Sequence, residues 1–309
     1  MHLIFDRLLR TAALLSMAAC TCLLVGCATV DLSPHLQPLS KDTLMLLGQK
    51  GMDVPSPIFI RIFKEESEFE VWKQRADGHF YHLKTYPICN WSGDLGPKVK
   101  QGDKQAPEGF YRIARSQMNP NSQFYLAFNL GFPNAYDRAN KRTGDALMVH
   151  GKCKSAGCYA MTDALIEEIY ALARESYLGG QELIQVHAMP FRMTEANMAR
   201  HRSSQWFPFW QTLKEGYDYF ELARVPPDVA VCQRQYMVNV RLQGGQPIGK
   251  MDGEAACPAL ERVAPVAFSP IAGDKLAQQT VVAGQKMHAM GASQMLPQSR
   301  AFDADRALQ

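Results

Sequence analysis

The sequence predicts an α+β domain that is mainly β, with its helices after the middle of the chain. Short apolar runs with high β-propensity recur between residues 58 and 149. The clearest amphipathic helix, over residues 162–177, comes only after them. The 309 residues contain no internal repeat, so we expect one folded body of roughly 200 residues.

The first strands are expected in antiparallel order. Ile58–Phe63 is a continuous apolar run around Arg61, and two further runs at 69–72 and 80–88 are joined by the turn residues 76–78. Residues 89–109 contain four glycines and two prolines, which argue against a regular element.

Later elements follow from the same signals. The helix over 162–177 has Thr162 or Asp163 as its N-cap and ends at Gly179-Gly180. Residues 194–215 read as two helical pieces. The remaining strands are expected over 110–114, 124–129, 145–149 and 183–187.

The charge balance excludes two classes of protein. Lys plus Arg is 33 and Asp plus Glu is 30, giving a formal net charge of +3. Such a balance does not fit a protein held on nucleic acid by a strong basic field, nor an acidic disordered chain. We therefore expect no nucleic-acid partner.

The N-terminus has the pattern of an export signal. Arg7 and Arg10 precede the uncharged segment 11–25, which as a helix would extend only about 22 Å, too short to span a bilayer. It ends in Leu24-Val25-Gly26-Cys27, which resembles the lipobox of bacterial lipoproteins. Cys20 is a competing site, and a plain signal peptide with an incidental cysteine is the alternative.

The lipobox resemblance implies that residues 1–26 are removed and that Cys27 carries lipid. Two or three acyl chains anchor a protein stably, so the membrane is an expected partner. Ala28 stands where an Asp often marks retention in the inner membrane. We therefore expect an exported protein, anchored in the outer membrane and facing the periplasm.

A chemical centre is indicated at residues 149–161, VHGKCKSAGCYAM. His150 follows a strand, and Cys158 follows Gly157 and precedes a helix. Imidazolium and helix-end amides both lower a thiol pKa, so the pattern suits a thiolate nucleophile. The bland alternatives are a histidine bonded to backbone and a buried inert thiol. A zinc site of His150, Cys153 and Cys158 would lack a C-x-x-C pair and a fourth ligand.

The same stretch resembles the signature of the L,D-transpeptidase (YkuD-type) catalytic domain family, and most closely its YafK-like murein transpeptidase subfamily. The longest match is HGKCKSAGCYAMTD. Relative to the broad family, the His-to-Cys spacing is short, Ala156 replaces a histidine, and Tyr159-Ala160 stand where an arginine is common. The matching segments are 93–98, 101–111, 128–138, 150–163, 187–194 and 209–221.

The resemblance implies a mixed β-sheet or sandwich fold and an attack on peptidoglycan stem peptides that contain diaminopimelate. Cys158 would be the nucleophile and His150 the general base and then acid. The amides of Gly157 and Cys158 would bind the oxyanion. An amine acceptor would make the enzyme a transpeptidase. No metal or organic cofactor is required.

Two alternatives to transpeptidation stay open. With water as the acceptor, the same fold would be an amidase or peptidase that cuts crosslinks or releases an outer-membrane lipoprotein from peptidoglycan. A protein that had kept only the fold would bind peptidoglycan without catalysis, against which the intact His150 and Cys158 speak.

Further side chains are candidates for substrate binding, and each has a structural alternative. Ser155 could orient the site or cap a turn, Tyr111 could line the cleft or belong to the core, and Arg192 could bind a stem carboxylate or form an ion pair. Lys98, Asp103 and Gly151 belong to glycine-rich turns beside the centre, where glycines can also serve only to shape the chain.

Composition and the resemblance together divide the chain. We expect a signal peptide over 1–26, a tether over 27–56, the catalytic domain over 57–225, an extension over 226–263 and a disordered tail over 264–309. The four cysteines that remain can pair in three ways in an oxidising periplasm. Cys232–Cys257 is the preferred pair, which would leave Cys89–Cys153 as the second. Cys153 could instead stay free as a redox partner of Cys158.

Overall fold

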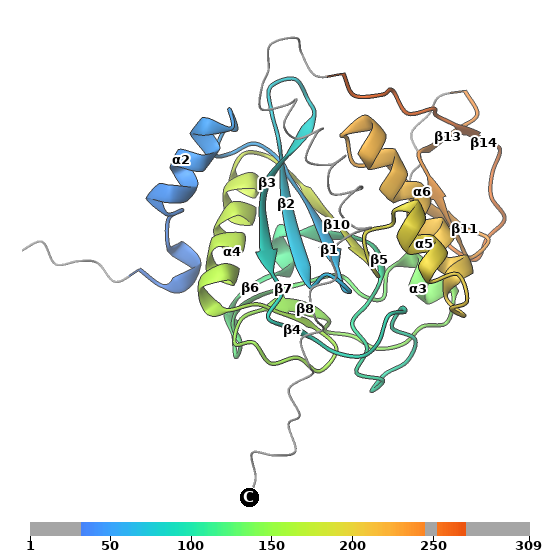
Figure 1. Ribbon diagram of the computed structural model, residues 1–309, viewed down its shortest axis with the longest axis horizontal. Helices are drawn as coiled ribbons and strands as arrows, with labels where there is room; N and C mark the ends of the chain where they lie inside the picture. Colours follow the sequence, from blue (N-terminus) through green and yellow to red (C-terminus); the bar gives the residue numbers. More distant parts are fainter. Residues whose placement is uncertain (1–31, 245–251, 270–309) are drawn as a thin grey trace, which may run out of the picture.

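Two five-stranded sheets form the centre of the computed structural model, which describes residues 32–244 and 252–269 (Figure 1). The strand orders are β3-β2-β1-β10-β5 and β4-β9-β8-β7-β6. This architecture confirms the expected α+β, mainly β fold class. The proposed signal peptide, Cys27 and residues 270–309 lie outside the described residues.

The first sheet is built around β1, which pairs antiparallel with β2 and parallel with β10. Its alternate side chains are buried on both faces: Ile60 contributes to the main core, whereas Phe59 and Phe63 pack toward α6. A central strand with two covered faces explains the apolar run in the sequence, in which Arg61 is the one charged residue. The sheet contains β1 (Ile58–Phe63), β2 (Glu68–Gln74), β3 (Phe80–Pro87), β5 (Gly109–Ala114) and β10 (Leu183–Met189).

The second sheet carries the chemistry. Its strands β8 and β9 are parallel neighbours, and the other pairs are antiparallel. The strands are β4 (Asn90–Trp91), β6 (Met118–Ser122), β7 (Tyr125–Asn129), β8 (Met148–His150) and β9 (Tyr159–Ala160). Because β4 and β9 have only two residues each, the sequence pattern did not reveal them.

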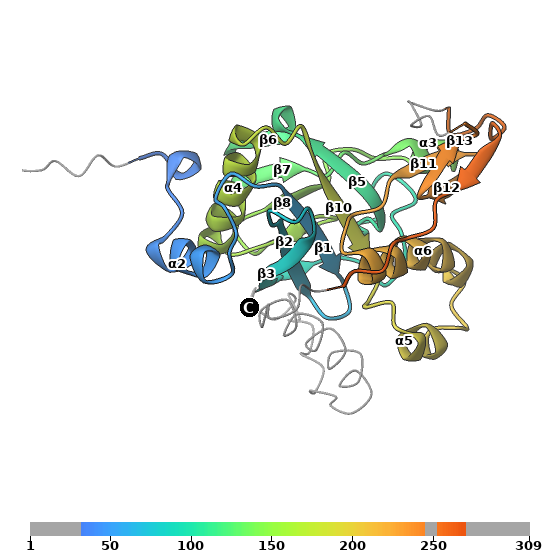
Figure 2. The same ribbon diagram turned by 90° about the horizontal axis from the view of Figure 1, so that it is seen from above.

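Helices cover the sheets from two sides (Figure 2). The helix α4 (Asp163–Leu178) begins after Thr162, whose hydroxyl accepts from Leu165 N, and it packs its buried face against β7. The helix α6 (Phe207–Ala223) covers the other face of the first sheet. The shorter helices are η2 (Pro34–Leu36), α2 (Lys41–Gln49), η3 (Arg115–Gln117), α3 (Ala135–Ala139) and α5 (Glu195–Arg200).

Part of the expected tether is folded, which corrects the prediction for residues 27–56. Leu39, Leu47 and Met52 are buried in the main core, and the Thr43 hydroxyl donates to Glu168 Oε1 on α4 at 2.9 Å. This contact spans 125 positions of sequence, so the local abundance of proline gave no sign of it.

The extension after α6 contains two two-stranded antiparallel sheets. Cys232 and Cys257 form a disulfide there. Where we expected the tail to begin, Phe268 N donates to Leu222 O, and the Phe268 ring packs on His79 and Tyr81. The strands of these two sheets are β11 (Val229–Cys232), β12 (Gln235–Val238), β13 (Val240–Leu242) and β14 (Leu260–Arg262). Within residues 32–244 and 252–269, no helix has the length and apolar character needed to cross a bilayer.

Candidate active site

The pairing of β8 with β9 places His150 and Cys158 on one face of the second sheet. Val149 lies opposite Tyr159, and His150 lies opposite Ala160. Val149 and Tyr159 point into the core, and strand side chains alternate between faces. His150 and Cys158, each one position away, therefore share the opposite face. Met148 N lies 3.4 Å from Cys158 Sγ and donates to it.

The environment of Cys158 keeps the thiol protonated, which corrects our expectation of a lowered pKa. Burial raises the pKa of the Cys158 thiol, and it outweighs the Met148 amide and the positive charge of Lys98, which lower that pKa. The helix N-terminus that we expected beside Cys158 does not lie there, because β9 follows Cys158 directly and α4 begins only at Asp163.

The imidazole of His150 is held in the form of a general base. His150 Nδ1 lies 2.7 Å from Gly151 O, and because a carbonyl can only accept, Nδ1 carries the hydrogen and Nε2 has the free lone pair. Burial lowers the pKa of His150, although the bond to Gly151 opposes this. Across the described residues, His150 and Cys158 make no hydrogen bond to each other, so proton transfer requires closer approach in the substrate complex.

The turn between the two residues is fixed at several points. Gly151 N donates to Phe124 O at 3.0 Å, and Lys152 N donates to Asp163 Oδ1 at 2.8 Å. Cys153 forms a disulfide with Cys89. This bond removes Cys153 both as a zinc ligand and as a free redox partner of Cys158. Cys158 is left as the one unpaired cysteine of residues 32–244 and 252–269.

The two amides proposed as oxyanion donors differ in whether they already donate a hydrogen bond in the structure. Cys158 N donates to Ser155 Oγ at 3.1 Å, and Ser155 Oγ in turn donates to Cys158 O at 2.6 Å. Gly157 N has no acceptor among the described residues. Ser155 therefore closes the turn around the nucleophile, and a substrate oxygen would have to replace its hydroxyl at the Cys158 amide.

The loop of residues 92–107 borders this turn, as the sequence led us to expect. The backbone of Gln105 faces Gly157, and Ser92 Oγ lies 3.4 Å from Ser155 Oγ. Lys98 is only 4% exposed, and its Nζ forms an ion pair with Asp103 Oδ1 at 2.5 Å. Three backbone amides and Lys98 overcome the effect of burial and lower the pKa of Asp103. Lys98 thus places a positive charge near the thiol.

A buried ion pair that the sequence analysis missed supports this loop. Lys64 Nζ lies 3.0 Å from Glu108 Oε1, and neither side chain is exposed. Lys64 also donates to Gly96 O, while Gly96 N and Trp210 Nε1 both donate to the Glu108 carboxylate. Lys64 stands at the end of a strand and Glu108 in a turn, so neither position distinguished it in the sequence.

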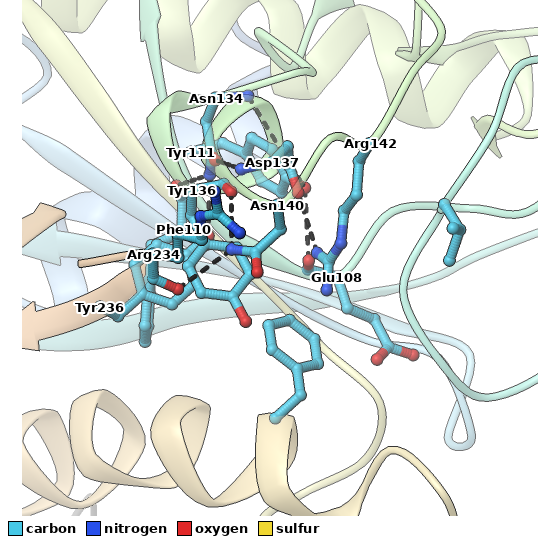
Figure 3. Close-up of polar contacts among 12 residues, drawn as sticks. Glu108, Phe110, Tyr111, Asn134, Tyr136, Asp137, Asn140, Arg142, Arg234 and Tyr236 are labelled. Atoms are coloured by element: carbon cyan, nitrogen blue, oxygen red, sulfur yellow. Dashed lines mark hydrogen bonds and ion pairs between the residues drawn. The ribbon is translucent and has the colours of Figure 1, made fainter. Parts of the chain in front are cut away.

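Tyr111 belongs to the interior and not to the substrate surface, which corrects the prediction. It is 1% exposed, and its hydroxyl lies 3.3 Å from Asp137 Oδ2 (Figure 3). Arg142 pairs with the other oxygen of Asp137 at 2.9 Å. In the same network Asn134 Nδ2 donates to Tyr236 Oη at 2.8 Å. The network joins α3 and the extension to β5.

Arg192 is also not available to a substrate carboxylate in the structure. Its guanidinium is paired with Glu68 and, at 2.6 Å, with Glu70 on β2. Arg61 binds the same Glu70 from β1 at 2.8 Å. The group is an internal ion network beneath α6 in the first sheet, away from the β8–β9 pair.

Comparison with known proteins identifies the family of the chain. Residues 61–184, which include His150 and Cys158, match the family model described as "L,D-transpeptidase catalytic domain". The chain is 45% identical over 217 residues to "Putative L,D-transpeptidase YafK" of Escherichia coli (strain K12), covering 70% of this chain and 87% of the relative. The YafK protein of Escherichia coli O157:H7 gives the same values.

Solved structures with some similarity are more distant. The "helical cell shape determining protein Pgp2 (K307A mutant)" from Campylobacter jejuni has 19% identity and a TM-score of 0.37, with 63% of this chain and 67% of that chain covered. Bd1075 of Bdellovibrio bacteriovorus has 17% identity and a TM-score of 0.31, with 54% and 59% covered. The sequence match to YafK and the family model decide the assignment: the chain belongs to the L,D-transpeptidase (YkuD-type) catalytic domain family.

Proposed function

We propose that the protein is a periplasmic, cysteine-dependent L,D-transpeptidase that acts on peptidoglycan stem peptides through an acyl-thioester enzyme. The observation that carries the proposal is the parallel β8–β9 pair, which brings a base-form imidazole and an unpaired thiol to the same face. Family membership supplies the substrate class.

The residues can perform each step without a cofactor. As the carbonyl carbon of the L-centre approaches, the Cys158 proton passes to His150 Nε2 and the sulfur forms a bond to that carbon. The developing oxyanion accepts from Gly157 N and, after Ser155 Oγ is displaced, from Cys158 N. The C–N bond then breaks, and His150 gives its proton to the leaving amine.

The thioester is released by the reverse sequence. An acceptor amine loses its proton to His150 Nε2 and attacks the thioester carbon, after which the C–S bond breaks and the sulfur recovers the proton. Water in place of the amine gives hydrolysis. Both acceptors use the same groups, so the product distribution identifies the reaction.

Chemical trapping tests the proposal. We expect purified protein to gain the mass of an acyl group, bound at Cys158, when mixed with a stem tetrapeptide that ends in diaminopimelyl-D-alanine. Cys158→Ala should gain no mass, and His150→Gln should acylate about 10²- to 10⁴-fold more slowly. The mechanism would be contradicted if wild type formed no adduct, or if Cys158→Ala formed one.

Muropeptide analysis tests the acceptor. Overexpression in cells that lack other members of the family should add crosslinks between two diaminopimelate residues, and Cys158→Ala should add none. An increase in free stems or in released lipoprotein, without new crosslinks, would identify water as the acceptor.

We also propose that the protein is lipidated at Cys27 and held in the outer membrane, facing the periplasm. This proposal is supported by the sequence Leu24-Val25-Gly26-Cys27 and by Ala28. Metabolic labelling with a radioactive fatty acid should mark the wild-type chain and not Cys27→Ala. Equal labelling of the two chains would contradict lipidation at Cys27. Recovery of the label in the inner-membrane fraction would contradict the outer-membrane location.

A further inference from the structure

An exposed aromatic side chain covers the imidazole of the candidate active site. The ring centroids of Phe124 and His150 are 4.6 Å apart, and the ring planes meet at 42°. Phe124 is 41% exposed, whereas His150 is 4% exposed. Phe124 therefore presents one side to the base and the other to solvent.

The turn between β6 and β7, which carries Phe124, is hydrogen-bonded to the turn that orients His150. Gly151 N donates to Phe124 O at 3.0 Å and to Leu126 O at 3.2 Å, and Lys152 Nζ donates to Gln123 O at 2.7 Å. Gly151 also supplies the carbonyl that holds His150 Nδ1. Phe124 and His150 are thus both held by hydrogen bonds to Gly151, and these backbone hydrogen bonds fix the position of one side chain relative to the other.

The backbone after Phe124 adopts a conformation that side chains normally avoid. Tyr125 has φ of 71°, in the left-handed region, which is strained for a residue other than glycine. Its hydroxyl is held by Glu167 of α4, and Phe124 N donates to Ser122 Oγ at 3.0 Å. The surrounding contacts therefore maintain a turn that directs Phe124 over His150.

We propose that Phe124 is a positioning residue that fixes the imidazole plane and shields His150 from bulk water, and thereby sets the ratio of amine to water in release of the thioester. The inference rests on the proposed acyl-enzyme for its effect on products. In either release step the acceptor proton passes to His150 Nε2, the acceptor bonds to the acyl carbon, and the C–S bond breaks. Water needs only an uncovered imidazole, whereas a stem amine arrives through binding of its peptide.

Among the influences on the protonation of His150, burial is the largest. The titratable groups on the elements around it are Lys152 on the turn, Asp163 and Glu167 on α4, and Cys158 before β9. In the described ranges, none of them is hydrogen-bonded to the imidazole, whose polar partner is Gly151 O. Burial is the first cause of its lowered pKa, and the Phe124 ring contributes to that burial.

Phe124→Ala tests the inference, with Phe124→Leu as the variant that retains an apolar cover. Leu178→Ala is the matched control, because Leu178 is 60% exposed and lies at the far end of α4. The first readout is the titration of His150 by NMR on histidine-labelled protein, assigned with His150→Gln. In Phe124→Ala the pKa of His150 should rise toward its ordinary value, while Phe124→Leu and Leu178→Ala should titrate like wild type.

The second readout is release of the acyl group from Cys158. After trapping with the stem tetrapeptide, loss of the adduct is followed in buffer and with a second stem peptide as the amine. Phe124→Ala should raise the water-to-amine ratio at least threefold, and the leucine variant should restore it. An unchanged titration and ratio in folded Phe124→Ala would overturn the inference. The titration needs no substrate, so it decides about Phe124 even if wild type forms no thioester, a result that would refute only the proposed function.

Discussion

The disulfide between Cys89 and Cys153 closes the turn that joins the base to the nucleophile. Cys89 N donates to Ala160 O at 2.9 Å, and Cys153 N donates to Met161 O at 3.1 Å. Both half-cystines are therefore also bound to the backbone immediately after Cys158. The crosslink acts on the few residues that set the relation of His150 to the thiol.

Loss of this disulfide should impair chemistry more than loss of the other one. Removing either native crosslink, as Cys89→Ser/Cys153→Ser or as Cys232→Ser/Cys257→Ser, should lower the free energy of unfolding by about 2–5 kcal/mol. Only the first double variant should slow acylation of Cys158, by about tenfold or more, because misplacement of reacting groups by about 1 Å is costly. Guanidinium unfolding and intact-mass kinetics provide the two measurements, and equal acylation rates in both double variants would refute the positioning role.

The pH profile should reflect a neutral pair rather than an ion pair. Burial lowers the pKa of His150 below its ordinary 6.5 and raises that of the Cys158 thiol above its ordinary value. The acylation rate should therefore rise with pH as the imidazole loses its proton, with the midpoint below pH 6.5, and then stay level until the thiol ionises. Alkylation of the thiol by iodoacetamide, followed against pH with Cys158→Ser as the blank, should increase only at alkaline pH. Rapid alkylation at pH 6 would indicate a thiolate–imidazolium pair instead.

Local signals were sufficient for the central elements and the reactive residues. The run Ile58–Phe63 has the apolar, β-prone composition of a strand covered on both faces, and α4 has a cap and a regular apolar spacing. His150 and Cys158 are recognisable because both stand beside glycine in a stretch long enough to match a family motif.

The errors concern features that depend on residues distant in sequence. Arg192 is paired with Glu68 and Glu70, more than 120 positions away, and α2 is held in part by a contact with α4. The direction of the Cys158 pKa depends on burial, which spacing does not reveal. The sequence pattern predicts Phe124 as the first residue of a strand, because no neighbouring residue indicates the left-handed conformation of Tyr125.

The positive charge of Lys98 should increase the reactivity of the Cys158 thiol. Its positive charge lowers the pKa of Cys158, and without it the carboxylate of Asp103 would be unpaired in the same loop. Lys98→Met should therefore slow alkylation of Cys158 at pH 8 by about threefold, or half a pKa unit, and Lys98→Arg should retain most of the rate. Lys100→Met, which removes an exposed charge from the same loop, is the control. Equal rates for Lys98→Met and Lys100→Met would place Lys98 outside the electrostatics of the thiol.

Gly157 should be required for chemistry as well as for stability. Its φ of 120° lies in a region that favours glycine, and an added Cβ would lie 3.5 Å from Leu147 Cδ2. Gly157→Ala should lower the free energy of unfolding by about 1–3 kcal/mol. By shifting the amides of residues 157 and 158 it should also slow acylation by about 10²-fold.

Gly78 provides the matched comparison for Gly157. It has φ of 84° in the turn between β2 and β3, with open space around an added Cβ. Gly78→Ala should therefore show a stability loss of similar size and a wild-type acylation rate. If the two variants lost stability and activity in parallel, the effect of Gly157→Ala would be a consequence of backbone strain in general. A loss of rate confined to Gly157→Ala would tie it to the amides that face the oxyanion.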